Sequence, residues 1–216
     1  MEGGRLTGSL ALIVGVRGLA PAIAKALNDA GSDVAVASES TDAEDMLAAR
    51  RIARRLQAPG TRTVSQGWDV TLPTNVQVGL RQVTKEFGRP PALVVYAADA
   101  PLRQPLTSTT DAQVGHVLQA NLAGAIYLAR AYTREVGATG TGTLAIALPA
   151  VGHEGMEAGA AIYAAARAGL AGLVEALALE LRARGVRVVG LRPMDGAGLA
   201  VGPAVVELAL GGGDHG

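Results

Sequence analysis

The sequence predicts an α/β fold in which a doubly wound parallel sheet carries helices on both faces. Six short aliphatic and β-branched runs are separated by segments with helical spacing, and this alternation extends through the chain. Such alternation is typical of parallel sheets, because parallel neighbours need a crossover connection. The runs are almost continuously apolar, as expected for strands buried on both faces. Since no linker composition separates them, we expect one domain over residues 1–216.

Local signals place the individual elements. The first strand is predicted at 9–16, and a helix follows at 20–31, where Pro21 suits a first turn and Gly31 suits a helix end. Thr41 or Asp42 is expected to cap the next helix. The remaining strands are predicted at 33–38, 61–70, 92–98, 142–148 and 186–193, and the remaining helices at 41–57, 75–88, 111–135 and 159–181.

Composition excludes several classes of function. The chain is 49% hydrophobic and 18% charged, with 19 acidic and 19 basic side chains, so its formal net charge is zero. Without a basic patch, nucleic acid is a poor candidate partner. The lack of cysteine excludes disulfides and thiolate sites, and three scattered histidines lack metal-ligand spacing, so no metal site is predicted. No run reads as a signal peptide or membrane span, so we expect a cytoplasmic protein without a membrane partner.

The turn after the first predicted strand contains Gly15 and Gly18, and Ala20 follows at the start of the helix. A dinucleotide-binding fold places glycine here because the backbone must turn tightly and approach a pyrophosphate at a helix N-terminus. Ala20 stands where a third glycine would let the helix pack closely on the strand. A simple strand–helix turn without a ligand would use the same residues, so both interpretations remain open at this point.

The chain resembles the short-chain dehydrogenase/reductase family over nearly its whole length. The segment "LTGSLALIVGVRGLAPAIAKALNDAGSDVAVAS" resembles the opening βαβ unit of that family. The segment "WDVT" resembles the family's contact with an adenine, which implies that Asp69 and Val70 lie beside one. The fourth-helix motif resembles "NLAGAIYLARA", and the Tyr-x-x-x-Lys segment resembles "IYAAARAGLAGL". The resemblance implies a Rossmann-like fold, an NAD or NADP cofactor, Tyr163 as the proton donor and Asn121 as the holder of a water.

The cofactor loop departs from the family pattern Thr-Gly-x-x-x-Gly-x-Gly. Val14 replaces the threonine, the spacer between Gly15 and Gly18 is one residue short, and Ala20 replaces the last glycine. After the fourth strand, Asp99 stands where the family has a glycine. An aspartate there adds negative charge close to the place of a pyrophosphate, which is unfavourable in a partly dry cleft. These departures imply weakened cofactor binding.

The catalytic positions depart further. Pro149 takes the place of the family's serine, and neither neighbouring register, Leu148 or Ala150, supplies a hydroxyl. Loss of such a preorganised donor typically costs about 10²–10³ in rate. Arg167 replaces the family's lysine and keeps its charge, but an arginine cannot release a proton. Tyr163 and Arg167 are therefore either an altered acid and its helper, or a cleft tyrosine and a solvated or interface charge.

Residues at the end of the second predicted strand do not choose between NAD and NADP. Ser38 lacks the carboxylate that would hold an NAD ribose. Glu39 would repel an NADP phosphate, whereas Arg17 would attract one. The two effects oppose each other, so either cofactor remains possible by resemblance.

Other polar residues give weaker signals. His153 and Glu154 follow the lost serine and suit either an acid–base pair or a polar loop. His116 is expected at a helix surface, and His215 in a glycine-rich C-terminal tail. After the last predicted strand the chain is short by the family's standard, which implies a C-terminally shortened fold with a reduced substrate lid.

Two helices predict an interface. The segment 164–181 carries alanine, glycine and leucine on nearly every side, and a helix of this kind needs cover all round. Small residues also let two helices approach closely. The helix predicted at 111–135 is similar, and the family resemblance implies that these two helices dimerise as a four-helix bundle. We therefore expect a homodimer, or a hetero-oligomer with a related subunit.

Two functions follow from these observations. The first is a catalytically impaired subunit that serves as a structural or regulatory partner in a homo- or hetero-oligomeric dehydrogenase. The alternative is an active NAD(P)-dependent oxidoreductase that acts on a carbonyl or alcohol through Tyr163. A nucleotide-binding sensor without turnover is a third possibility.

Overall fold

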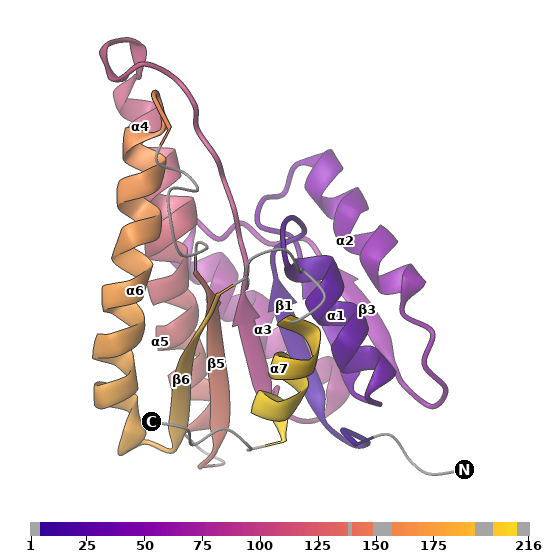
Figure 1. Cartoon of the computed structure of the whole chain (residues 1–216). Coiled ribbons are helices and arrows are strands. Elements are labelled where there is room, and N and C mark those ends of the chain that lie inside the picture. The colour runs from indigo at the N-terminus through magenta and orange to yellow at the C-terminus, as the bar shows by residue number, and fades with distance from the viewer. Residues whose placement is uncertain (1–4, 138–139, 149–156, 193–200, 211–216) are drawn as a thin grey trace.

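The computed structural model of the chain describes residues 5–137, 140–148, 157–192 and 201–210, and it contains a six-stranded parallel sheet (Figure 1). The strands lie in the order β3-β2-β1-β4-β5-β6. Their bounds are Leu10–Val14 (β1), Asp33–Ala37 (β2), Thr63–Gln66 (β3), Leu93–Tyr96 (β4), Gly142–Ala147 (β5) and Val186–Leu191 (β6). Strand order reverses between β1 and β4, so the predicted Rossmann-like, doubly wound sheet is confirmed, with its ligand crevice expected at the carboxyl ends of these two strands.

Helices cover both faces of the sheet. One layer contains α1, α2 and α7, and the other contains α3, α5 and α6 (Figure 1). The bounds are Ala20–Asp29 (α1), Ala43–Arg55 (α2), Pro73–Phe87 (α3), Asp111–Leu118 (α4), Gly124–Val136 (α5), Ala161–Arg182 (α6) and Val201–Ala209 (α7). Successive strand residues face opposite layers, so Leu12 packs in the α3, α5 and α6 core, whereas Ile13 packs in the core of the other layer.

The local signals for helix ends were partly right. Helix α1 has Pro21 in its first turn, and Gly31, at φ +94°, lies just beyond its end, as predicted. Asp42 occupies the N-cap position of α2, as predicted, but its side chain makes no capping hydrogen bond. Instead the backbone N–H of Asp42 donates to the hydroxyl of Ser40 at 3.2 Å.

Two predicted elements differ from the observed ones. The strand predicted to reach residue 70 ends at Gln66, because Trp68 leaves the sheet edge and donates its backbone N–H to the Ser38 hydroxyl at 3.1 Å. Its buried indole packs against Gly79 of α3. The helix predicted at 111–135 is interrupted between α4 and α5 by a π-helical segment, η2 (Gln119–Ala123). Such segments are rare and are frequent at functional sites.

Candidate active site

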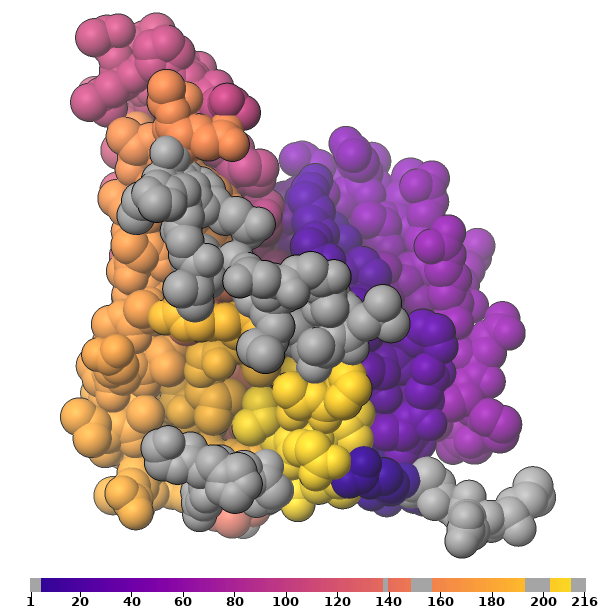
Figure 2. Space-filling view, viewed as in Figure 1, coloured from indigo at the N-terminus to yellow at the C-terminus, as the bar shows by residue number. Residues whose placement is uncertain are grey.

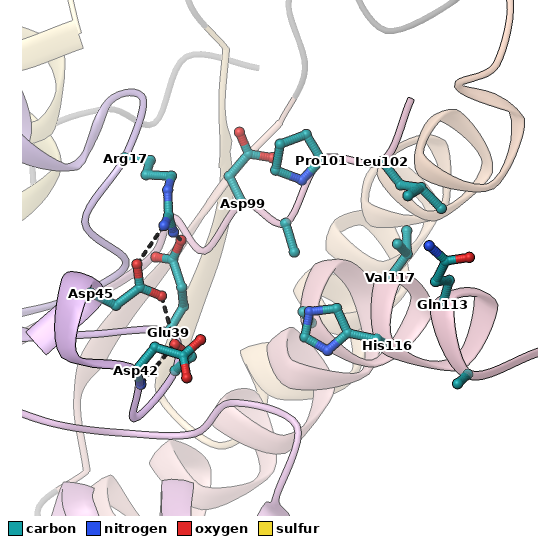
Figure 3. A pocket seen from close by; sticks show the side chains of 14 residues that line it. Arg17, Glu39, Asp42, Asp45, Asp99, Pro101, Leu102, Gln113, His116 and Val117 are labelled. Atoms are coloured by element: carbon teal, nitrogen blue, oxygen red, sulfur yellow. Dashed lines mark hydrogen bonds and ion pairs between the residues drawn. The ribbon is translucent and has the colours of Figure 1, made fainter. Parts of the chain in front are cut away.

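A cavity of about 540 Å³ opens at the carboxyl ends of β1, β2 and β4, and we refer to it as the cleft. One side is formed by the β1–α1 turn and the start of α2, and the other by α4 (Figure 3). The cleft lies at the point where the strand order reverses, which is the usual ligand position in such folds. Its lining includes the carboxylates of Glu39, Asp42, Asp45 and Asp99, and the cations or potential cations Arg17 and His116.

The glycine loop is shaped by a close crossing of two backbones. Gly15 has φ +130°, and a Cβ there would collide with the backbone of Ala97 and come within 2.8 Å of the Ala98 nitrogen. Gly18 has φ +55°, with open space around it. The glycine at position 15 is therefore explained by the crossing of the β1 and β4 ends, and a bound phosphate is not needed to account for it.

Glu39 fills the space beside this loop. Its carboxylate is buried, accepts the backbone N–H of Val16 at 2.9 Å and forms an ion pair with Arg17 (Figure 3). Arg17 also donates to Asp45 at 2.5 Å, and the other Asp45 oxygen accepts the hydroxyl of Ser40 at 2.7 Å. Burial raises the pKa of Glu39 above its usual value, and this effect outweighs the Val16 N–H and Arg17, which lower it.

Arg17 and Glu39 both bind other groups of the protein at the end of the second strand. The guanidinium of Arg17 is held by two carboxylates, whose charges offset its attraction for a 2′-phosphate. The carboxylate of Glu39 accepts the first N–H after Gly15. A bound anion would have to displace this carboxylate to reach the same N–H. Sequence reasoning missed Asp45, because an acidic residue in a first helical turn is ordinarily a surface partner of the helix dipole.

The other predicted cofactor contacts serve the protein backbone. The buried hydroxyl of Ser38 donates to the Ser40 carbonyl at 2.7 Å. Asp69 accepts the N–H and hydroxyl of Thr71 at 2.9 and 2.6 Å, which closes a local turn. Val70 is buried, and its N–H donates to the Glu39 carbonyl at 3.1 Å. Ser38, Asp69 and Val70 are not among the described residues that line the cleft.

Asn121 lies inside the π-helical segment and is completely buried. Its amide nitrogen donates to the carbonyls of Ala100 and Val117 at 2.8 and 2.9 Å, and its oxygen accepts the N–H of Ala100 at 3.1 Å. The buried hydroxyl of Tyr96 donates a hydrogen bond to the carbonyl of Ala120, the residue before Asn121. The polar groups of Asn121 are thus used to fix the chain after β4, which differs from the water-holding role that the resemblance implied.

Tyr163 and Asp99 form the most informative pair of the site. The half-buried phenol of Tyr163, on the first turn of α6, donates to Asp99 Oδ1 at 2.7 Å. Burial, together with the hydrogen bond and charge of Asp99, raises the pKa of Tyr163 to about 12. Arg167, one turn further along α6, acts in the opposite direction but does not prevail. The Nε of Arg167 is buried without a hydrogen-bond partner among the described residues.

The remaining candidates are distributed as follows. Leu148 is buried and donates its N–H to the Leu191 carbonyl at 2.7 Å, so it offers no polar group to the cleft. His116 is exposed on α4, as predicted, and also lines the cleft. Pro149, Ala150, His153, Glu154 and His215 lie outside the described residues. Within the described part of the chain, no group of three or more acidic, histidine or cysteine side chains is placed to hold a metal ion.

Comparison with known proteins decides the family. A family model described as "Enoyl-(Acyl carrier protein) reductase" matches residues 14–194. The chain belongs to the short-chain dehydrogenase/reductase family. It is 33% identical to the short-chain reductase protein NovJ of Streptomyces niveus, over 94% of this chain and 74% of that protein. It is 31% identical to the 3-oxoacyl-[acyl-carrier-protein] reductase FabG of Pseudomonas aeruginosa, over 87% of this chain and 74% of that protein.

A solved structure gives the same result. A metagenomic short-chain oxidoreductase in complex with NADP has a TM-score of 0.82 and 26% identity, and the likeness covers 95% of this chain and 92% of that one. The residues that line the cleft of this chain do not fit an NADP whose phosphates lie against the loop after β1. Four carboxylates line its cleft, the Arg17 cation is already paired, and the Val16 N–H is already bound. Like charges in a partly dry site repel a phosphate.

Proposed function

We propose that this short-chain dehydrogenase/reductase is a catalytically impaired subunit, which acts in the cytoplasm as a structural or regulatory partner in a homo- or hetero-oligomeric dehydrogenase. The observation that carries the proposal is the hydrogen bond from Tyr163 to Asp99. A carbonyl reduction needs an acid whose proton points at the substrate and whose pKa lies near the working pH. The Tyr163 proton points at a carboxylate of the protein, and its pKa is about 12.

The surrounding groups support impairment. The charge of Arg167 lowers the phenol pKa, as a lysine there would, but its guanidinium stays charged at all working pH values and so cannot pass a proton as a lysine can. The family resemblance implied that Asn121 holds a water, but its amide forms hydrogen bonds with the backbone of Ala100 and Val117. The cleft therefore retains the shape of the family's site, while its own carboxylates take up the donors that a ligand would use.

The surface of α6 supports an assembly. Its small residues form an exposed stripe along the helix, and Leu179 is 81% exposed. Figure 2 shows α6 along one side of the molecule, with little cover from other described segments in this view. The exposed residues of α6 are Ala161, Ala165, Ala168, Gly169, Gly172, Glu175, Ala176, Leu179, Glu180 and Arg182, so charges gather only toward the C-terminal half of the helix. Such a stripe suits close helix packing against a second subunit.

A membrane is the competing explanation for this helix. Within the described residues, α6 alone has the length and mean hydropathy, 1.5, of a candidate membrane span. Only 11% of that apolar window is buried. We favour a protein partner because α6 packs along the sheet edge at β6 and against α4 and η2, an arrangement that a spanning helix would have to abandon.

A groove of about 320 Å³ between α5 and α6 continues the same face and is lined by Arg130, Arg134, Glu180 and Arg184, among others.

Two measurements test the proposal. NADH and NADPH are titrated by nicotinamide fluorescence, and the native mass is measured for the protein alone and after co-expression with an active homologue from the same host. We expect no saturable binding at micromolar cofactor, and a mass that corresponds to a dimer or a mixed oligomer. Micromolar binding together with turnover would reject the proposal, as would a monomer under both conditions.

The alternative is an active NAD(P)-dependent oxidoreductase that uses Tyr163. Membership of the family and the retention of Tyr163 favour it. The test is a panel of carbonyl substrates with NADH and NADPH, followed by Tyr163→Phe. If turnover is found and Tyr163→Phe abolishes it, the alternative replaces the first proposal.

A further inference from the structure

Asp99 occupies a constrained position between the glycine loop and the start of α6. It follows β4, lines the cleft and accepts the phenol of Tyr163 through Oδ1 at 2.7 Å. The next residue, Ala100, is held at both its N–H and its carbonyl by the buried side chain of Asn121, at 3.1 and 2.8 Å. The backbone that presents the Asp99 carboxylate is thus anchored to the π-helical segment, and we expect it to have little freedom to turn away from the phenol.

We propose that Asp99 is the residue that disables Tyr163: its carboxylate, more than the arginine at position 167, keeps the phenol protonated and directs its proton into the protein. This inference deepens the proposed function and rests on it. Asp99 acts through Tyr163, so it is a positioning residue. The proposal assigns the loss of acidity to a residue outside the Tyr-x-x-x-Arg segment, which sequence reasoning had treated only as an obstacle to a pyrophosphate.

The charges around the phenol support this assignment. Among the residues that the structure describes, two charged groups act on the phenol: Asp99 comes from the chain after β4, and Arg167 comes from α6 itself. Asp99 bonds to the phenol directly, whereas Arg167 acts through space only. The other ionisable groups that line the cleft are Arg17, Glu39, Asp42, Asp45 and His116, and none of them makes a hydrogen bond to the phenol. A like charge in contact disfavours ionisation, and burial strengthens the effect.

The test is the ionisation of Tyr163 in solution. Asp99→Asn keeps the shape and removes the charge, and Asp99→Gly introduces the residue that the family pattern has at this position. Asp42→Asn is the matched control, because Asp42 lines the same cleft but makes no bond to the phenol. Phenolate is followed by its ultraviolet absorbance during a pH titration, and each variant is compared with the same variant carrying Tyr163→Phe, so that the other three tyrosines cancel.

We expect the Tyr163 midpoint to fall by about one pH unit or more in Asp99→Asn, which is about a ten-fold gain in acidity, because a like charge in contact is removed. Asp99→Gly should lower it at least as far, and Asp42→Asn should leave it unchanged. An Asp99→Asn midpoint equal to that of the parent would overturn the proposal, and so would an equal fall in the control. Circular dichroism before and after each titration shows whether the fold persists.

A second variant separates this inference from the proposed function. Arg167→Lys restores the family's cation; alone, it should change the Tyr163 midpoint less than Asp99→Asn does, and the opposite order would contradict the assignment. The titration requires no cofactor and no turnover. If the parent protein binds NADH and reduces a carbonyl, the proposed function fails, while the titration still decides whether Asp99 governs the phenol.

Discussion

The carboxylate of Glu39 accepts the backbone N–H of Val16 at 2.9 Å, so an anion of the protein lies against the loop that follows β1. The same carboxylate pairs with Arg17, which reaches across to Asp45 (Figure 3). A second internal anion, Asp99, holds the phenol of Tyr163. The two carboxylates thus satisfy, from within the protein, a backbone donor of the loop after β1 and the phenol donor at the start of α6.

The buried Glu39 gives a prediction for pH. Because its pKa is raised in the folded state, the folded protein binds this proton more tightly than the unfolded chain does. The stability that comes from this group is therefore present below pH 4.5 and is lost as pH rises through the folded pKa. Glu39→Gln does not titrate, so its melting temperature relative to the parent should rise between pH 4 and 7.

Thermal melts at several pH values in that range measure the effect. Glu44→Gln is the control, since Glu44 is exposed on the first turn of α2, close to Glu39 in the chain. A difference between Glu39→Gln and the parent that stays constant, or that shrinks with rising pH, would show that burial does not dominate at Glu39.

The pairing of Arg17 predicts a preference between cofactors. Any residual dinucleotide binding should favour NADH over NADPH by about ten-fold or more, because a 2′-phosphate would meet carboxylates and an arginine that is already paired. Fluorescence titration of both cofactors checks this. The double variant Glu39→Gln, Asp45→Asn should bring the affinities for NADH and NADPH closer together, because it removes the two charges that pair with Arg17. Tighter binding of NADPH by the parent would contradict the prediction.

The backbone crossing at Gly15 predicts a large loss of stability. Gly15→Ala should lower the free energy of unfolding by about 2–4 kcal/mol, because a Cβ has no space beside Ala97 and φ +130° is strained for alanine. Gly115→Ala is the control: Gly115 lies in α4 with open space around it, so alanine there should be neutral or stabilising by up to about 1 kcal/mol. Urea denaturation compares the two, and equal effects would exclude the crossing as the cause.

The buried hydroxyl of Tyr96 predicts a coupling between β4 and the π-helical segment. Tyr96→Phe leaves the Ala120 carbonyl without this donor and should cost about 1–3 kcal/mol of stability. Tyr127→Phe, at a partly buried tyrosine on α5, should change stability by about 0.5 kcal/mol or less. Denaturant unfolding measures both, and a neutral Tyr96→Phe would mean that water or a shifted helix replaces the bond.

The exposed stripe on α6 predicts the assembly surface. Leu179→Glu should weaken self-association or hetero-association by at least about ten-fold, since it places a charge in an apolar helix contact. Leu47→Glu, on α2 in the opposite layer, should leave the mass unchanged. Light scattering coupled to size exclusion gives the mass over a concentration series. An unchanged mass for Leu179→Glu would place the interface elsewhere.

Much of the fold could be predicted from local patterns. Apolar runs that alternate with helical spacing indicate a parallel sheet, since hydrophobic periodicity depends only on neighbouring residues. Pro21 and Gly31 marked the ends of α1 for the same reason, because each residue limits its own backbone angles. The segment around Tyr163 was specific enough to indicate the family that the comparisons then showed.

The site depended on contacts that no local pattern contains. Tyr163 and Asp99 are 64 positions apart, and Arg17 is 22 and 28 positions from its two carboxylates. The sequence alone determined the layers of the fold and the order in which loops reach the cleft. Only the tertiary structure decided which anion meets which donor, because that depends on how the strand ends bring distant loops together and on how far each carboxylate is removed from water.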